Sequence, residues 1–284
     1  MITAMKVRYI IMCLMALFAL SGQAKKHKQL VILHSNDTHS QIFPFRSQMP
    51  DTMKAGRSGF LRRINLLKEE RKKHPDLLYF DSGDFFQGSP YFTMFKGEVE
   101  IGLMNQMGID ASTIGNHEFD FGLDNMAQMF RKATFPILCA NYDFTGTVME
   151  GLTKPWMVIK RNGLKIGVFA VSPKLEGLVS TKNCPGVKYL DPARVALETA
   201  TMLKEQLKCD MVICISHLGW NSGRGEDDHY MIKGSRNIDL VLGGHSHTYM
   251  EELQYEKNLD GKPVAVDQNG KSAIYIGKIV VNFK

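Results

Sequence analysis

Five short polar segments of the sequence contain side chains that can bind metal ions. The segments are residues 34–39, 81–84, 115–118, 216–217 and 243–247. Taken alone, a histidine in such a segment is more often a hydrogen-bonded structural residue than a ligand. Here five of the nine histidines group with aspartates and an asparagine, whereas His27, His34, His74 and His229 show no such grouping and are expected to be structural or surface residues. The residues predicted to form a metal site are Asp37, His39, Asp84, Asn116, His217, His245 and His247.

The types of these side chains indicate which metals the site would hold. Oxygen and imidazole donors without thiolate suit Zn, Mn, Co or Fe better than Mg or Ca. Seven donors exceed what one tetrahedral zinc can use, so we expect two divalent metal ions with the Asp84 carboxylate between them. Two metals about 3.5 to 4 Å apart can activate water and hold both the attacking and the leaving oxygen at phosphorus. The donor set therefore favours hydrolysis of phosphate esters.

Each polar segment follows an apolar run that is typical of a strand. Side chains two positions apart on an extended segment point the same way, so Asp37 with His39, and His245 with His247, can each share a metal. Ligands of α/β proteins bind at the carboxyl ends of the strands, so five such ends would bring the donors into one cleft. The apolar runs are residues 30–33, 77–80, 111–114, 135–138, 166–171, 211–215 and 239–242.

Helical patterns lie between several of these runs, which predicts an α/β domain with largely parallel sheets. The expected helices are residues 59–73, 98–107, 122–132 and 191–207. The last of them opens with Asp191 and Pro192, which suit a cap and a first turn. Residues 264–283 instead suggest antiparallel strands joined around the Asn-Gly pair at 269–270. No linker divides residues 25–284, so we expect them to form one domain.

The first 24 residues have the pattern of a secretory signal. Lys6 and Arg8 precede an apolar run at residues 9–20, and small residues follow up to Ala24. The run is shorter than the roughly 20 residues that span a bilayer, so cleavage after Ala24 is favoured over a stable membrane anchor. The expected location of the protein is therefore the periplasm or the outside of the cell. Its net charge of +6 is too small and too dispersed to indicate a nucleic-acid partner.

Four cysteines follow the signal, at positions 139, 184, 209 and 214, and none of them forms a CxxC pair. Export would permit disulfides, but Cys139 and Cys214 lie in apolar runs where buried thiols are common. Thiolate metal binding is therefore not expected.

The polar segments also resemble a known family. The strings HSNDTH, DSGD followed by FFQG, GNHEFD, SHLG and GGHSHT occur in this order. They resemble the amino-terminal, calcineurin-like metallophosphoesterase domain of secreted bacterial 5'-nucleotidases and UDP-sugar hydrolases, over nearly all of residues 28–283. The resemblance implies a four-layer α/β/β/α sandwich. It implies one metal on Asp37, His39 and His247, a second on Asn116, His217 and His245, and a bridging Asp84.

The resemblance further implies a catalytic dyad of His117 and Asp120. His117 would stabilise charge on the phosphoryl group or the leaving oxygen, and Asp120 would orient it. Their spacing agrees, because residues i and i+3 share one face of a helical turn and a carboxylate behind an imidazole fixes its tautomer. Glu118, between them, is expected to be structural.

These features predict hydrolysis of phosphomonoesters, with nucleoside 5'-monophosphates as the favoured small-molecule substrates. The alternatives are cleavage of phosphodiester or pyrophosphate bonds, as in cyclic nucleotides or UDP-sugars, and a noncatalytic metal-binding subunit. The ligands and the dyad are intact, which disfavours the last. Family members carry a second, carboxy-terminal domain that contacts the base, whereas this sequence stops at Lys284. A separately encoded carboxy-terminal domain is therefore a possible partner, and without it we expect little preference among bases.

Overall fold

A four-stranded sheet carries three of the predicted ligand segments. The computed structural model describes residues 28–220 and 225–283. Parallel pairing joins β1 to β2 and β2 to β3, and the last strand runs antiparallel to β1. The order across the sheet is β12 (Gly277–Phe283), β1 (Lys28–Ser35), β2 (Leu78–Asp81) and β3 (Ala111–Ser112).

A six-stranded sheet carries the other two segments. Its four central strands are parallel, and an antiparallel strand closes each edge. The order is β10 (Gln254–Lys257), β11 (Pro263–Asp267), β9 (Leu240–Leu242), β8 (Met211–Ser216), β6 (Leu164–Val171) and β5 (Trp156–Arg161). A separate two-stranded ribbon pairs β4 (Tyr142–Asp143) with β7 (Lys188–Tyr189).

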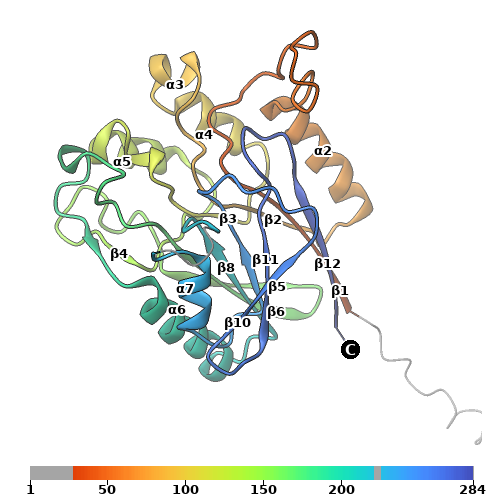
Figure 1. Cartoon of the computed structure of the whole chain (residues 1–284), viewed down its shortest axis with the longest axis vertical. Coiled ribbons are helices and arrows are strands. Elements are labelled where there is room, and N and C mark those ends of the chain that lie inside the picture. The colour runs from red at the N-terminus through yellow and green to blue at the C-terminus, as the bar shows by residue number, and fades with distance from the viewer. Residues whose placement is uncertain (1–27, 221–224, 284) are drawn as a thin grey trace, which may run out of the picture.

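The two sheets pack face to face, and helices cover the outer face of each (Figure 1). Leu30, Ile32 and Phe80 of the first sheet meet Ile213 and Leu242 of the second in a buried cluster. The helices on the first sheet are α2 (Phe60–Lys73), α4 (Glu98–Met104) and α5 (Gly122–Lys132), with α3 (Pro90–Phe95) beyond them; those on the second are α6 (Pro192–Thr201) and α7 (Asp228–Lys233). This is the predicted α/β/β/α sandwich.

The helices follow from their apolar spacing and their caps. In α2, Phe60, Ile64 and Leu67 recur on one face and are fully or almost fully buried. As predicted, the Asp191 side chain accepts a hydrogen bond from the backbone N–H of Arg194, and Pro192 occupies the first turn of α6. A π-helical turn (Met202–Gln206) continues α6, and short 3₁₀ turns occur at His117–Phe119 and Thr181–Asn183.

Two expectations about strands were wrong. Residues 135–138 form only isolated bridges, to Ser112 and Lys154, rather than a strand. Residues 264–283 do not form a hairpin around Asn269-Gly270, because β11 and β12 belong to different sheets. The pairing of β12 with β1 along Lys28 to His34 outweighs the local turn preference of Asn-Gly. Residues 268–276 consequently cross from one sheet to the other.

Three further expectations concern export, cysteines and membranes. The predicted signal, residues 1–24, and His27 lie outside the described residues. Cys139, Cys209 and Cys214 are buried, Cys184 is half-buried, and all four are free thiols. No helix in residues 28–220 and 225–283 has both the length and the apolar content that a bilayer crossing requires.

Candidate active site

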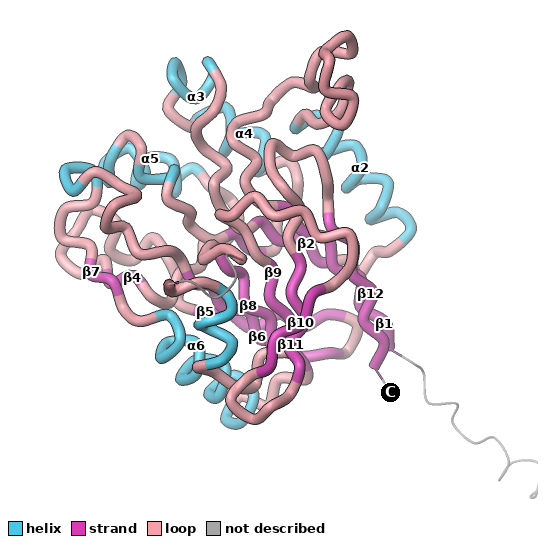
Figure 2. The backbone as a smooth tube through the Cα atoms, in the orientation of Figure 1, coloured by secondary structure: helices cyan, strands magenta, loops and turns pink. Residues whose placement is uncertain are grey.

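The five polar segments meet at one end of the sandwich, where loops extend beyond the strands (Figure 2). Segments after β1, β2 and β3 come from the first sheet, and segments after β8 and β9 come from the second. Hydroxyl groups tie the sheets together at this end. Ser82 Oγ donates to the carbonyl of Leu242 (2.9 Å), and Ser172 Oγ donates to the carbonyl of Ile114 (2.7 Å). The predicted metal ligands therefore come from both sheets and lie where the two sheets meet.

Asp37, His39 and His247 form one group whose candidate ligand atoms all lie within 4.8 Å of one another. His39 Nε2 is 2.9 Å from His247 Nε2, and Asp37 Oδ1 is 3.4 Å from the same nitrogen of His247. Two imidazole nitrogens and a carboxylate oxygen thus lie close together, and a metal on these three residues, which the family resemblance implies, stays a prediction.

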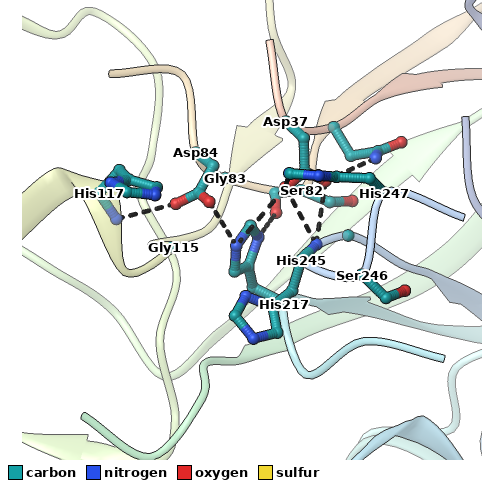
Figure 3. A network of polar contacts seen from close by, with 12 residues as sticks. Asp37, Ser82, Gly83, Asp84, Gly115, His117, His217, His245, Ser246 and His247 are labelled. Carbon is teal, nitrogen blue, oxygen red and sulfur yellow. Dashed lines mark hydrogen bonds and ion pairs between the residues drawn. The ribbon is translucent and has the colours of Figure 1, made fainter. Parts of the chain in front are cut away.

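Asp84, His217 and His245 form a second group within the same distance limit. Asp84 Oδ2 lies 3.1 Å from His217 Nε2, and Asp84 Oδ1 accepts a hydrogen bond from the backbone N–H of His117 (2.9 Å). Figure 3 shows Asp84 between His117 and His217, with Asp37 and His247 beyond His217. Asp84 also forms a third group with His39 and His117, and His39 belongs to the first group, so the position of Asp84 suits a carboxylate shared between two ions.

Several donor atoms of the site have no hydrogen-bond partner within the described residues. Asn116 Oδ1 is buried without a partner, and His217 Nε2 is buried without a hydrogen bond although the Asp84 carboxylate lies 3.1 Å away. Buried polar atoms are almost always satisfied, so such exceptions call for a ligand or an ion. Together with the oxygen and imidazole donors around them, they fit bound divalent cations.

Five of the seven predicted ligands have left-handed backbone conformations, with φ between 43° and 72°. For residues with a side chain this region costs of order 1 kcal/mol each and is concentrated at functional sites. Backbone hydrogen bonds hold it in place. Asp37 N–H donates to Gly83 O (3.0 Å), His39 N–H donates to Asp84 O (3.0 Å), and His245 N–H donates to Asp37 Oδ2 (2.9 Å). Hydrogen bonds between the loops that carry the predicted ligands therefore stabilise these backbone conformations.

Two buried groups behind the predicted ligands, the Ser82 carbonyl and the Asn36 side chain, could not be recognised from the sequence. His217 Nδ1 lies 2.5 Å from the carbonyl of Ser82, which makes it the protonated nitrogen and leaves Nε2 free to act as a donor atom. Asn36 Nδ2 donates to Asp37 Oδ2 (2.6 Å) and to Gly270 O (2.8 Å). The contacts with Ser82 and Asn36 orient His217 and Asp37, respectively. The Ser82–His217 and Asn36–Gly270 contacts also join segments that only the fold brings together.

Glu118 has the structural role expected of it. Its buried carboxylate accepts hydrogen bonds from the backbone N–H groups of Asp84, Phe85, Phe86 and Gly115, at 2.6 to 3.2 Å. Burial and the nearby Asp84 carboxylate raise the pKa of Glu118 to about 8. Glu118 thus connects the loop after β2 to the loop after β3.

His117 and Asp120 form the expected pair. The 3₁₀ turn places His117 Nδ1 3.1 Å from Asp120 Oδ2, and about a third of each side chain is exposed. The His117 ring lies edge-on to that of His39, with 5.3 Å between the ring centres. Burial opposes protonation of His117, but the Asp120 hydrogen bond and the Asp84 charge outweigh it and raise its pKa. His117 can therefore hold a proton beside the ligand groups.

The pKa values of the other imidazoles are shifted in opposite directions: that of His217 is raised, and those of His245 and His39 are lowered. Burial disfavours the charged form of His217, but the Asp84 and Asp37 carboxylates outweigh burial and raise its pKa to about 10. Burial and the charge of His217 lower the pKa of His245 to about 4. Burial also lowers the pKa of His39. Without a metal, a proton on His217 offsets the carboxylates, so a cation bound there would have to displace it.

A cavity of about 360 Å³ opens above the ligand groups. The imidazoles of His39, His117 and His247 line it. The rest of its wall is formed by Gln41, Phe45, Gln87, Gly88, Lys271 and Ser272. A second cavity, of about 660 Å³, extends from Gln87 and Gly88 past Asp120 to Phe121 and α3. Space for a substrate therefore lies directly over His117.

Two of the four histidines outside the predicted site, His34 and His229, have other partners. His34 is buried with its Nε2 2.8 Å from Asp267 Oδ2. His229 Nδ1 lies 2.7 Å from Glu256 Oε2, and its ring packs against Trp220 with 3.6 Å between ring centres. Neither contributes to the ligand groups, and both contacts are structural, as expected.

Known proteins are similar to this chain in sequence. Residues 30–249 match the family described as calcineurin-like phosphoesterase. The chain is 29% identical to the 5'-nucleotidase of Rattus norvegicus over 97% of its own length and 50% of that protein. It thus spans about half the length of the curated 5'-nucleotidases it matches.

Solved structures of related proteins have a similar fold. The 5'-nucleotidase precursor of Thermus thermophilus superimposes with a TM-score of 0.81 at 26% identity, over 90% of this chain and 52% of that chain. The NAD nucleotidase of Haemophilus influenzae gives a TM-score of 0.81 at 26% identity, over 91% and 54%. With the family match over most of its length, the chain belongs to the calcineurin-like phosphoesterase family.

Proposed function

We propose that this chain hydrolyses phosphomonoesters with two divalent metal ions, and that nucleoside 5'-monophosphates are its favoured substrates. The observation that carries the proposal is the pair of ligand groups, one on Asp37 and one on His217, with Asp84 in the second group and within 4.8 Å of His39 of the first. The His117–Asp120 pair lies beside them under an open cavity. The similarity to 5'-nucleotidases supports the substrate class.

The ligand assignment is part of the proposal. One ion would be held by Asp37, His39 and His247, and the other by Asn116, His217 and His245, with Asp84 shared. The donor types favour Zn, Mn, Co or Fe. Bound there, the ions would supply Lewis-acid activation of water and of the phosphoryl group.

His117 would act on the leaving oxygen or on a phosphoryl oxygen. With Nδ1 bonded to Asp120, its Nε2 is the nitrogen free to donate a proton. The Asp120 hydrogen bond and the Asp84 charge raise its pKa against the opposing effect of burial, which favours the protonated form that an acid needs. Asp120 fixes the ring and its tautomer, so we assign it an orienting role.

A second candidate is the cleavage of phosphodiester or pyrophosphate bonds, for example in cyclic nucleotides or UDP-sugars. The same predicted ligands would hold the metal ions for this reaction, and the names of two relatives favour this second candidate. One is the NAD nucleotidase above, and the other is the trifunctional nucleotide phosphoesterase protein of Bacillus subtilis, 27% identical over 89% of this chain and 18% of that protein. A noncatalytic metal-binding role gains no support, because every predicted ligand and both members of the dyad are present.

A second unit would complete the leaving-group site. The relatives are about twice as long as the matched region, and large apolar side chains near the two cavities are exposed, including Phe43, Phe121 and Met94. We propose that a carboxy-terminal nucleotidase domain covers this face. We also propose that the protein works in the periplasm or outside the cell, which accords with the signal pattern at residues 1–24.

The direct test is turnover by the purified protein after reconstitution with Mn or Zn. Hydrolysis of AMP and p-nitrophenyl phosphate that stops with a chelator and returns with metal would support the proposal. A preference for bis-p-nitrophenyl phosphate would favour the second candidate. The absence of metal-dependent turnover on all of these esters would overturn both.

A further inference from the structure

The crossing segment 268–276 is anchored on the candidate active site. Gln268 Nε2 donates to Gly244 O (2.8 Å), and the backbone N–H of Gly270 donates to Thr248 O (2.8 Å). The backbone N–H of Ser272 donates to Asp37 O (2.7 Å). The main chain on both sides of Lys271 is thus fixed to residues that are, or adjoin, predicted ligands.

The conformation after Lys271 is also unusual. Ser272 and Ala273 both have left-handed backbones, with φ of 59° and 58°. Such residues cost of order 1 kcal/mol each and persist where the surroundings fix them. Ser58 Oγ, which donates to the carbonyl of Ser272, adds one such contact. The segment therefore holds residue 271 at a defined place on the rim of the cavity.

Lys271 is the only lysine or arginine among the described residues that line the 360 Å³ cavity. Its side chain is exposed, and in the described part of the chain it has neither an ion pair nor a hydrogen bond. The other lining residues, apart from the three imidazoles, carry no charge. A free ammonium group therefore borders the space directly above His39, His117 and His247.

We infer that Lys271 binds the phosphoryl group of the substrate and favours monoesters over diesters. This inference rests on the proposed function. Above its second pKa of about 6 a phosphomonoester carries nearly two negative charges, whereas a diester carries one. Because Coulomb attraction is proportional to charge, one ammonium group attracts the monoester about twice as strongly in free-energy terms. Lys271 is thereby a specificity-determining residue.

The size of the effect follows from the exposure of the side chain. Water screens an exposed ammonium group, so we expect loss of its charge to lower kcat/KM for a monoester about tenfold rather than a hundredfold. A diester carries half the charge, so the logarithm of the loss is halved and kcat/KM should fall about threefold. Replacing Lys271 with a negatively charged residue should double the logarithm of each loss, to about a hundredfold for the monoester and about tenfold for the diester.

The experiment compares Lys271→Gln, Lys271→Glu and Lys271→Arg in the metal-reconstituted protein. Lys160→Gln and Lys160→Glu are matched controls, because Lys160 is an exposed lysine on β5 that pairs with Lys165 at the end of the sheet away from the cleft. The measurements are kcat/KM at pH 8 for p-nitrophenyl phosphate and bis-p-nitrophenyl phosphate. Calorimetric binding of inorganic phosphate to each protein is a readout that needs no turnover.

We expect Lys271→Glu to lower the ratio of monoester to diester kcat/KM about tenfold and to weaken phosphate binding, with Lys271→Arg close to the parent. Equal losses for both esters, or losses no larger than those of the Lys160 variants, would overturn the inference. Unchanged phosphate binding in Lys271→Glu would overturn it as well. If the parent protein binds phosphate but hydrolyses no ester, the proposed function fails and the calorimetry still decides the role of Lys271.

Discussion

The substitution Gly115→Ala tests whether the position of Asp84 controls metal binding. A Cβ at residue 115 would lie 2.1 Å from Asp84 Oδ1 and 2.7 Å from both Asp84 Cγ and Asp84 N. The carboxylate oxygen would have to move by about 1.3 Å to reach an ordinary contact of 3.4 Å. Ligand distances in metal sites are held to about 0.2 Å, so this shift is several times larger than a site tolerates.

Two losses follow from that displacement. The hydrogen bond from the His117 backbone N–H to Asp84 Oδ1 breaks, and overpacking of a buried site costs about 1–3 kcal/mol. We therefore expect Gly115→Ala to lower the Tm of the metal-free protein by a few degrees. Because Asp84 belongs to one ligand group and lies within 4.8 Å of His39 in the other, we also expect metal affinity to fall at least about tenfold.

Gly102→Ala is the matched control. Gly102 lies in the exposed face of α4, and an added Cβ there meets nothing within 4 Å. Alanine in a helix interior is favoured over glycine by up to about 1 kcal/mol, so this variant should be as stable as the parent or slightly more stable. Thermal unfolding with a chelator and calorimetric titration with Mn are the assays. A Gly115→Ala protein with parental Tm and parental metal affinity would refute the assigned geometry of Asp84.

Three further predictions concern catalysis, acid stability and specificity. His117→Asn should reduce turnover by roughly 10² to 10⁴ with metal content intact, and Asp120→Asn should reduce it less; elemental analysis beside kinetics checks this, and loss of metal would instead make His117 a ligand. Lys278 and Lys73 lower the pKa of Glu70 from 4.5 to about 2, so its stabilisation is complete above pH 4.5 and lost as pH falls through about 2. The free energy of unfolding, measured with urea at pH 3 and pH 7, should therefore fall less on acidification in Glu70→Gln than in the parent. An equal fall in both proteins would show that this ion pair does not stabilise the fold. The isolated chain should hydrolyse AMP, GMP and UMP with kcat/KM values within tenfold; a preference above about a hundredfold, or 2.7 kcal/mol, would reveal a base pocket within this chain.

Much of the candidate site could be predicted because its signals are local. Asp37 with His39, and His245 with His247, follow apolar runs at a spacing of two. Their backbones are left-handed rather than extended, however, and His245 and His247 belong to different ligand groups. Parallel strands present their carboxyl ends at one edge, so the meeting of these segments followed from the α/β pattern. The structure brings all seven predicted ligands to that edge.

What could not be predicted depends on contacts between distant segments. Glu118 is visible as an acidic residue, but its backbone partners in the loop after β2 are more than 30 positions away. The Asn-Gly pair at 269–270 has the composition of a hairpin turn, yet sheet pairing assigns the flanking strands to opposite sheets. Lys271 was therefore not recognised as part of the cavity wall, because its position depends on that crossing.

The central claim is that two metal ions share Asp84, and metal stoichiometry tests it most directly. Equilibrium dialysis of the metal-free protein against Mn or Zn, followed by elemental analysis, should give two ions per chain. Asp84→Asn should reduce occupancy of both sites, because a neutral amide is a poor bridge between two cations. One ion or none in the parent, or two tightly bound ions in Asp84→Asn, would contradict the account.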